Sequence, residues 1–353
     1  MKRKLVFVTV FLIVIFTGSI FLTKPGFSFT LDDDIEVGVY YYPWYKQGWR
    51  NYHWNSSKEY PKWNVVDTPL LGHYSCQDES VVMQHLEWME DIGIDFVILS
   101  WWGNERVLGG SSYEDESCRF IFSIIKQYEY PIKAALMVEG FNETNGIYNF
   151  PSIFDYINET YITHYSDVYM LLDNKPLLCW YNAANMTGTS ENPKPENIME
   201  ICNEGRFESR IVGHNTYVNW SFSIPCSVNS SIIPPLSEDG MICVEPRYDD
   251  SYIGGNSTFD GNLTEGLYDK QWNEVIRLKN EGEVKYVTIY SWNEYHERSQ
   301  IEPHISRDGK CVLSLLYKTK RYVQIIPEFP SFLILPLFMM ATLLAVIVYR
   351  RKK

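Results

Sequence analysis

The chain has 353 residues, of which 45% are hydrophobic, and a formal net charge of -13 at pH 7. This length can bury a large core, either as one barrel-sized domain or as two smaller ones. The acidic balance argues against nucleic acid as a partner, because nucleic-acid-binding surfaces carry an excess of basic residues.

The chain begins with a basic and then apolar segment. Residues 1–23 start with Met-Lys-Arg-Lys and continue with a mostly apolar run from Leu5 to Leu22, long enough as a helix to cross a membrane. We predict a signal peptide or an uncleaved signal anchor here, since no clear small-residue cleavage site follows. Residues 24–34 are predicted to be a linker.

Residues 35–326 alternate between strand and helix patterns. Predicted helices span 78–92, 118–128 and 267–281, and predicted strands span 36–42, 94–100, 132–138, 175–181, 209–214, 241–244 and 284–291. Such alternation indicates a parallel sheet. We therefore predict a single α/β domain, a (β/α)8 TIM barrel, with a doubly wound open sheet as the alternative. Either residues 220–228 or the segment near Cys311 would supply the eighth strand.

Polar and aromatic residues follow several of these strands. Tyr40–Tyr45, Trp101–Gly103, Glu139 and Glu245–Asp250 come after the first, second, third and sixth strands. The carboxyl ends of barrel strands hold the active site. Aromatic rings there suit the apolar faces of sugars, although an aromatic-rich core explains many of them equally well.

The last predicted strand leads into the most polar stretch of the chain. Trp292, Asn293, Glu294, Tyr295, His296 and Glu297 follow it directly. Glu294 and Glu297 are three residues apart, so in a turn or short helix they project to the same side. Each would raise the other's pKa, giving the acid and base that glycosidic cleavage requires. The ordinary alternative is a capping acid beside a surface acid. A zinc-protease motif is excluded, because position 300 is Gln instead of His.

The segment from Ser291 to Pro303 resembles the signature of glycoside hydrolase family 99, the endo-α-mannosidases and endo-α-mannanases. The family usually shows Trp-Asn-Glu-Trp-His-Glu-Gly-Thr-Gln-Ile-Glu-Pro there. Further resemblances follow the family's order and extend the match over about residues 36–303: Tyr41–Tyr45, Gly72–Ser75 with Asp78 and His85, Ser100–Gly103, Glu139 and Tyr248–Tyr252.

The resemblance implies a retaining endo-α-mannosidase in which Glu294 removes the proton of the sugar 2-hydroxyl and Glu297 protonates the leaving oxygen. The residues alone do not distinguish this route from a two-carboxylate displacement. The residues expected to bind an oligosaccharide or polysaccharide substrate are Tyr42, Trp101, Trp102, Glu139, Tyr252, Trp292, Asn293 and His296. No metal and no organic cofactor is expected.

Arg298 departs from the family pattern, which has Gly there. A guanidinium beside Glu297 would lower the pKa of the proposed acid, unless it points away or binds an anionic sugar. Two alternatives therefore stay open: a non-catalytic glycan-binding or cell-envelope protein on this scaffold, and a hydrolase of another α-glycan.

The chain closes with a second apolar segment. Residues 327–353 contain an apolar run and a basic tail, and Pro327–Pro330 resembles an archaeal carboxyl-terminal sorting signal. Two spans with basic ends place the domain between them outside the cell. Seven cysteines without a Cys-x-x-Cys pair argue against structural zinc. Eight glycosylation sequons agree with a membrane-anchored surface glycoprotein: Asn55, Asn142, Asn158, Asn185, Asn219, Asn229, Asn256 and Asn262.

Overall fold

The computed structural model describes residues 35–48, 53–55, 65–104, 108, 112–139, 149–172, 174–181, 188, 212–213, 221–223, 236 and 240–325. The predicted terminal segments, 1–23 and 327–353, and the linker 24–34 lie outside these residues. Within the described part, no helix has both the length and the apolar character needed to span a membrane.

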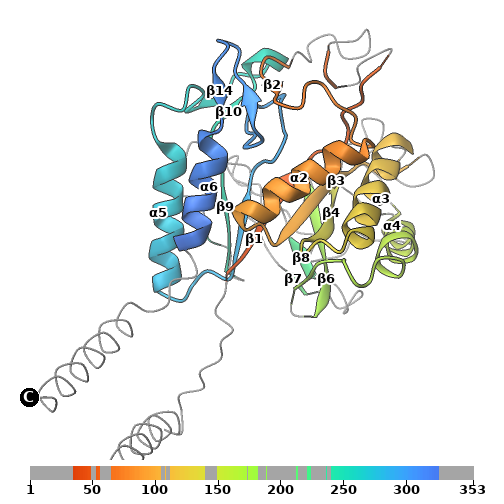
Figure 1. The fold of residues 1–353 in the computed structure, drawn as a ribbon. Coiled ribbons are helices and arrows are strands. Elements are labelled where there is room, and N and C mark those ends of the chain that lie inside the picture. Colours follow the sequence, from red (N-terminus) through yellow and green to blue (C-terminus); the bar gives the residue numbers. More distant parts are fainter. Residues whose placement is uncertain are drawn as a thin grey trace, which may run out of the picture. The chain divides into compact units, whose positions relative to one another are not determined.

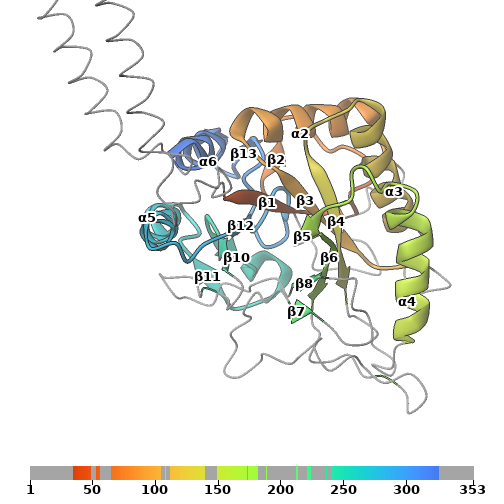
Figure 2. The same cartoon turned by 90° about the horizontal axis from the view of Figure 1, so that it is seen from below.

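The centre of the fold is a curled parallel sheet. Seven parallel strands follow one another in the order β8 (Ser221–Ser223), β6 (Lys175–Tyr181), β4 (Lys133–Glu139), β3 (Phe96–Trp101), β1 (Glu36–Tyr41), β12 (Tyr286–Ile289) and β9 (Met241–Val244). In the end-on view of Figure 2 the strands curve around a common centre. This part of the chain has a TIM-barrel-like fold, and among the described residues no strand joins β9 to β8.

In the described part of the chain, five α-helices lie outside the sheet (Figures 1 and 2): α2 (Glu79–Ile92), α3 (Ser112–Gln127), α4 (Phe150–Ile157), α5 (Leu267–Asn280) and α6 (Ser314–Ile325). Helix α2 begins and ends as its sequence predicts. The Asp78 side chain accepts a hydrogen bond from the Ser80 N–H at 3.0 Å, and Gly93 ends the helix with φ 81°. Helix α3 begins six residues before the predicted start, because its first turn carries buried Glu114 and Asp115, which hide the apolar periodicity.

One strand prediction is wrong, and of the two candidates for the eighth strand one lies in the main sheet. The segment predicted as a parallel strand at 209–214 contains β7 (Val212–Gly213), which pairs antiparallel with β8 and is not a barrel strand. The 220–228 segment supplies the parallel strand β8 instead. The segment near Cys311 forms β14 (Cys311–Val312), in a small sheet with β13 (His304–Ile305) and β2 (Thr68–Pro69).

The remaining short elements lie in connections. They are β5 (Leu171–Leu172), the antiparallel pair β10 (Tyr248–Asp249) and β11 (Thr258–Phe259), a π-helical turn Asn158–Ile162 and a 3-10 turn Ser251–Ile253. The β10–β11 pair follows β9 and supplies side chains to the site described below.

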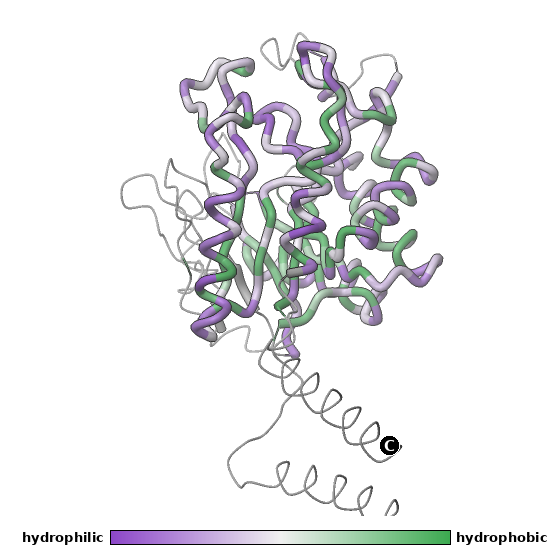
Figure 3. The backbone as a smooth tube through the Cα atoms, turned by 60° about the vertical axis from the view of Figure 1, so that its left-hand side comes forward, coloured by the Kyte–Doolittle hydropathy of each residue, from purple (hydrophilic) through white to green (hydrophobic). Residues whose placement is uncertain are grey.

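The strands carry the core. All six residues of β3 are buried, and the strands form the most hydrophobic part of the chain in Figure 3, while the helices alternate between hydrophobic and hydrophilic turns. Gly38 in β1 lets the Phe96 ring of β3 approach closely, because a Cβ there would lie 2.2 Å from that ring. Parallel pairing brings the carboxyl ends of the strands to one edge, where Glu139 lies in register with Tyr181.

Candidate active site

The loop after β12, residues 290–303, is fixed to the end of β1. The Trp292 N–H donates to the Tyr40 carbonyl at 2.7 Å. The Asn293 side chain then completes the attachment: its Oδ1 accepts from the Tyr42 N–H at 2.7 Å, and its Nδ2 donates to the Tyr42 carbonyl at 3.0 Å. This pairing brings the loop's two glutamates to the carboxyl edge of the sheet.

Glu297 is held by two tyrosine hydroxyls. Tyr290 donates to its Oε2 at 2.5 Å, and Tyr248 donates to its Oε1 at 3.1 Å. Tyr42 donates in turn to the Tyr290 hydroxyl at 2.9 Å. Burial, followed by the neighbouring Glu294, raises the pKa of Glu297 to about 7, against the opposing effect of the two hydroxyls. A carboxyl with this pKa can both give and take a proton near neutral pH.

Glu294 lies beside Glu297 and has a different set of partners. Its Oε1 accepts the His296 backbone N–H at 2.8 Å and lies 3.4 Å from His296 Nδ1. Its own N–H donates to Ser291 Oγ at 2.8 Å. The two glutamates therefore have the different surroundings that separate a base from an acid.

A third carboxyl comes from the end of β4. Glu139 Oε1 accepts from Ser100 Oγ at 2.7 Å. Burial raises the pKa of Glu139 to about 8; the Ser100 hydrogen bond opposes this rise, while the charges of Glu294 and Glu297 add to it. Of the three carboxyls, Glu139 and Glu294 are only 4% and 2% exposed, and Glu297 is partly exposed. Glu297 is thus the one most open to a substrate oxygen.

Aromatic rings stand beside the carboxyls. Trp44 stacks on His53 with ring centroids 4.5 Å apart, and lies 4.7 Å from Tyr42 and 6.1 Å from Trp102. His296 joins this group, 5.7 Å from Trp44. The sequence predicts Tyr42, Trp102 and His296 as binding residues, and the structure brings them together here.

Other predicted binding residues lie elsewhere. Trp101 is fully buried, where its Nε1 donates to Asp115 of α3. Trp292 is also fully buried, with its ring centroid 5.5 Å from that of His85 in α2. Asn293 is fully buried too, with its amide used to hold Tyr42. Their side chains belong to the protein interior and not to the group around Glu297.

Tyr252 packs against two arginine side chains. The Arg298 and Arg307 guanidinium carbons each lie 5.5 Å from its ring centroid. Tyr248, from the same motif, is the tyrosine that contacts Glu297. Tyr252 is among the predicted binding residues and Tyr248 and Tyr290 are not, although Tyr248 lies in the polar stretch after the predicted 241–244 strand and Tyr290 lies near the end of the predicted 284–291 strand.

A buried polar network lies between helix α2 and the site loop. His85 Nε2 lies 3.1 Å from Glu302 Oε1, and Tyr41 OH lies 3.0 Å from His85 Nδ1. Tyr74 donates to Glu302 Oε2 at 2.8 Å, and Asn293 Nδ2 lies 3.2 Å from the Tyr74 hydroxyl. The network links α2 to the loop and gives a structural reason for the third acidic residue of the motif, Glu302.

Replacing Glu302 by Ala is expected to lower the free energy of unfolding by about 2–6 kcal/mol, because two buried partners, His85 and Tyr74, lose their acceptor and each orphan costs about 1–3 kcal/mol. Chemical denaturation measures this loss. The matched control is Glu281→Ala, which removes an exposed ion pair to Arg277 and should cost less than about 1 kcal/mol. Equal losses in the two variants would contradict the role given to the network.

Glu245, which follows β9, is a fully buried carboxyl whose two oxygens have no hydrogen-bond partner among the residues that the structure describes. Burial, and next the charge of Glu297, raise the pKa of Glu245 well above its ordinary value. Its surroundings therefore favour the protonated form in the folded protein.

Replacing Glu245 by Gln is expected to stabilise the protein at neutral pH. Above pH 4.5 the unfolded chain releases this proton while the folded chain keeps it, so stability falls as pH rises toward the folded pKa. Gln does not ionise, and the wild-type loss of thermal stability between about pH 5 and about pH 8 should shrink in the variant. Calorimetry at both pH values tests this; identical declines in the two proteins would contradict it.

Solved structures similar to this chain are found, whereas the comparisons with family models and with curated proteins find no match. Two solved structures of the GH99 endo-alpha-mannosidase from Bacteroides thetaiotaomicron, one of them in complex with bis-tris-propane, are similar to it, with TM-scores of 0.56 and 0.58 and sequence identities of 18% and 19%. Each alignment covers 84% of this chain and 98% of the other. The chain has a GH99-like fold.

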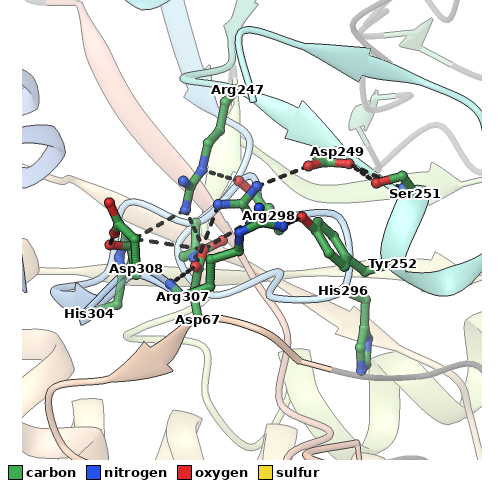
Figure 4. Close-up of polar contacts among 12 residues, drawn as sticks. Asp67, Arg247, Asp249, Ser251, Tyr252, His296, Arg298, His304, Arg307 and Asp308 are labelled. Carbon is green, nitrogen blue, oxygen red and sulfur yellow. Dashed lines mark hydrogen bonds and ion pairs between the residues drawn. The ribbon is translucent and has the colours of Figure 1, made fainter. Parts of the chain in front are cut away.

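Within this GH99-like fold, Arg298 points away from the carboxyls. Its guanidinium pairs with Asp67 and Asp249 (Figure 4). Its φ of 54° is in the left-handed region, which explains why Gly suits this position in the family signature. Among the described residues, no group of three or more His, Cys, Asp or Glu side chains is arranged to hold a metal ion.

Proposed function

We propose that this chain is a retaining glycoside hydrolase of the endo-α-mannosidase type that cleaves α-mannoside linkages in glycans. The observation that carries the proposal is Glu297, a partly exposed carboxyl with its pKa raised to about 7 and with Glu294 beside it. The GH99-like fold supports the same class of reaction.

In the proposed reaction the two glutamates have separate roles. Glu294 takes the proton of the sugar 2-hydroxyl, and that oxygen attacks the anomeric carbon as Glu297 gives its proton to the leaving oxygen. Glu297 then takes a proton from water, and the water oxygen attacks the anomeric carbon and opens the 1,2-anhydro ring. The released O2 atom regains its proton from Glu294, which restores the 2-hydroxyl. Both attacks invert the carbon, so the configuration is retained. This division agrees with the hydrogen-bond donors to Glu294 and the raised pKa of Glu297.

The surrounding groups suit a sugar. Glu139, with a pKa of about 8, is protonated at neutral pH and can donate a hydrogen bond to a sugar oxygen. Trp44 and Trp102 offer aromatic faces near Tyr42. The charge of Arg298 is used in ion pairs, which removes the main reason to favour a non-catalytic protein.

The test is an incubation of the purified protein with a panel of α-mannans, high-mannose oligosaccharides and α-glucans, with the released oligosaccharides identified by mass spectrometry. Release of mannose oligosaccharides from internal linkages is expected. Products from α-glucans alone would redirect the proposal to another α-glycan. Binding without products after long incubation would replace it with a glycan-binding role.

We also propose that the protein is anchored at the cell membrane with this domain outside. The terminal apolar segments support this placement, as do the four sequon asparagines within the described residues, Asn55, Asn158, Asn256 and Asn262, which are all exposed. Cys243 is disulfide-bonded, which suits an oxidising compartment. Protease treatment of intact cells should digest the domain; full protection in intact cells, with digestion after lysis, would refute an outside location.

A further inference from the structure

We propose that Arg298 is a positioning residue for Glu297, acting through Asp249 and its neighbour Tyr248. The proposal rests on the proposed function in one respect, the role of Glu297 as the acid. We call Asp67, Arg298 and Asp249 the Asp67–Arg298–Asp249 clamp.

The backbone separates Glu297 from Arg298. Arg298 has φ 54°, a left-handed conformation that is unfavourable for a residue with a Cβ and persists only where its surroundings hold it. The two adjacent side chains consequently meet different partners. Glu297 meets Tyr248 and Tyr290, whereas Arg298 meets the two aspartates.

The aspartates hold the guanidinium from two sides. Arg298 Nη1 lies 2.9 Å from Asp249 Oδ2, and Arg298 Nε lies 3.2 Å from Asp67 Oδ2 (Figure 4). Burial alone would raise the pKa of Asp67, but Arg247 and then Arg298 hold it below its ordinary value. For Asp249, burial is likewise outweighed by hydrogen bonds from Ser251 and Arg298. Both carboxylates are therefore charged at neutral pH and compensate the arginine.

Asp67 does more than pair with Arg298. It also accepts from Arg247 Nη2 at 2.8 Å, Gln300 Nε2 at 3.0 Å and the Arg307 N–H at 3.1 Å. Arg247 Nε in turn donates to the Arg298 carbonyl at 2.6 Å. The clamp thus fixes the backbone that follows Glu297 as well as the Arg298 side chain.

Asp249 connects the clamp to Glu297. Its backbone N–H donates to the Glu297 carbonyl at 2.7 Å. Tyr248, the preceding residue, donates to Glu297 Oε1 at 3.1 Å. The Asp249 carboxylate also accepts from the Ser251 and Thr258 hydroxyls. Loss of Arg298 therefore removes the ion pair of Asp249 and loosens, without releasing, the strand that carries the Tyr248 hydroxyl.

The clamp also keeps a cation from acting on the acid. The titratable groups that face Glu297 come from its own loop and from five strands or the residues directly after them: Glu294, His296, Tyr290, Tyr248, Glu245, Glu139, Tyr181 and Tyr42. None of these groups except His296 can carry a positive charge. An uncompensated Arg298 would add one and favour the deprotonated form of Glu297.

The experiment compares Arg298→Gly, Arg298→Lys and Asp249→Asn with the wild type. Glycine accepts the left-handed backbone, so Arg298→Gly removes the clamp without adding strain. We expect kcat to fall by about 10²-fold, as for a misplaced catalytic group, with KM changed less than about threefold. Arg298→Lys should recover part of kcat. In Asp249→Asn, the Glu297 titration, followed by NMR of ¹³C-labelled carboxyls, should move to lower pH.

The control is Asp115→Asn on α3, which neutralises a buried carboxylate bonded to Trp101 and Tyr161. It should lower thermal stability and leave the Glu297 titration unchanged. Folded Arg298→Gly and Asp249→Asn proteins with wild-type kcat and wild-type Glu297 titration would overturn the proposal. The titration requires no turnover, so it decides the role of the clamp even if the wild type cleaves no glycan, an outcome that would refute only the proposed function.

Discussion

Glu297→Gln is expected to lower kcat on α-mannans by about 10²- to 10⁴-fold, the usual contribution of a general acid–base group. Glutamine has the size of the glutamate and keeps one oxygen that can accept from Tyr290, while its NH2 group can donate to the Tyr248 hydroxyl, but it has no proton of the required acidity. Steady-state kinetics on a defined oligosaccharide measures the loss. The wild-type rate should also fall above about pH 7, because Glu297, with its raised pKa, then loses the proton that it must donate.

An aryl α-mannobioside provides the control for this prediction. A phenolate with a low pKa leaves without protonation, so kcat/KM of Glu297→Gln on this substrate should stay within about tenfold of the wild type. Its kcat should still fall, since Glu297 also activates the water of the second step. An equal loss of kcat/KM on the aryl and the sugar leaving groups would assign Glu297 a role other than acid.

The sequence predicts the fold best where local chemistry is distinct. Asp78 and Gly93 mark the ends of α2. The bounds predicted for β9 agree with the structure to the residue, because its short run of β-branched and sulfur-containing apolar residues is typical of a buried strand. The 209–214 segment was misplaced because periodicity identifies an extended chain but does not say whether it pairs parallel or antiparallel. Pairing direction depends on contacts distant in sequence.

The candidate site divides in the same way. The spacing of Glu294 and Glu297 in a polar stretch after a strand predicts that they lie together. It does not say which tyrosines bind them, and Tyr248 and Tyr290 come from two separate strand ends. Likewise, the direction of the Arg298 side chain depends on a left-handed backbone and on Asp67, 231 residues away in the sequence. Trp101 and Trp292 show the converse, because aromatic residues at strand ends face either the site or the helices.

Glu294→Gln is expected to abolish measurable cleavage while sugar binding persists, with kcat lower by about 10³-fold or more, because the 2-hydroxyl loses its base and O2 loses its nucleophilic character. A second effect separates this variant from a simple loss of binding. The charge of Glu294 raises the pKa of Glu297, so the Glu297 titration should move below its wild-type position near 7 when that charge is removed. Calorimetric binding of a mannose oligosaccharide and NMR titration of the labelled carboxyls measure the two effects in one protein.

Glu294→Asp is the matched control, since it keeps the charge and withdraws the carboxylate by one methylene. It should lose activity yet leave the Glu297 titration near the wild-type value. Wild-type turnover in Glu294→Gln would show that Glu294 is not the base. An unshifted Glu297 titration would show that the charge of Glu294 does not raise the pKa of Glu297.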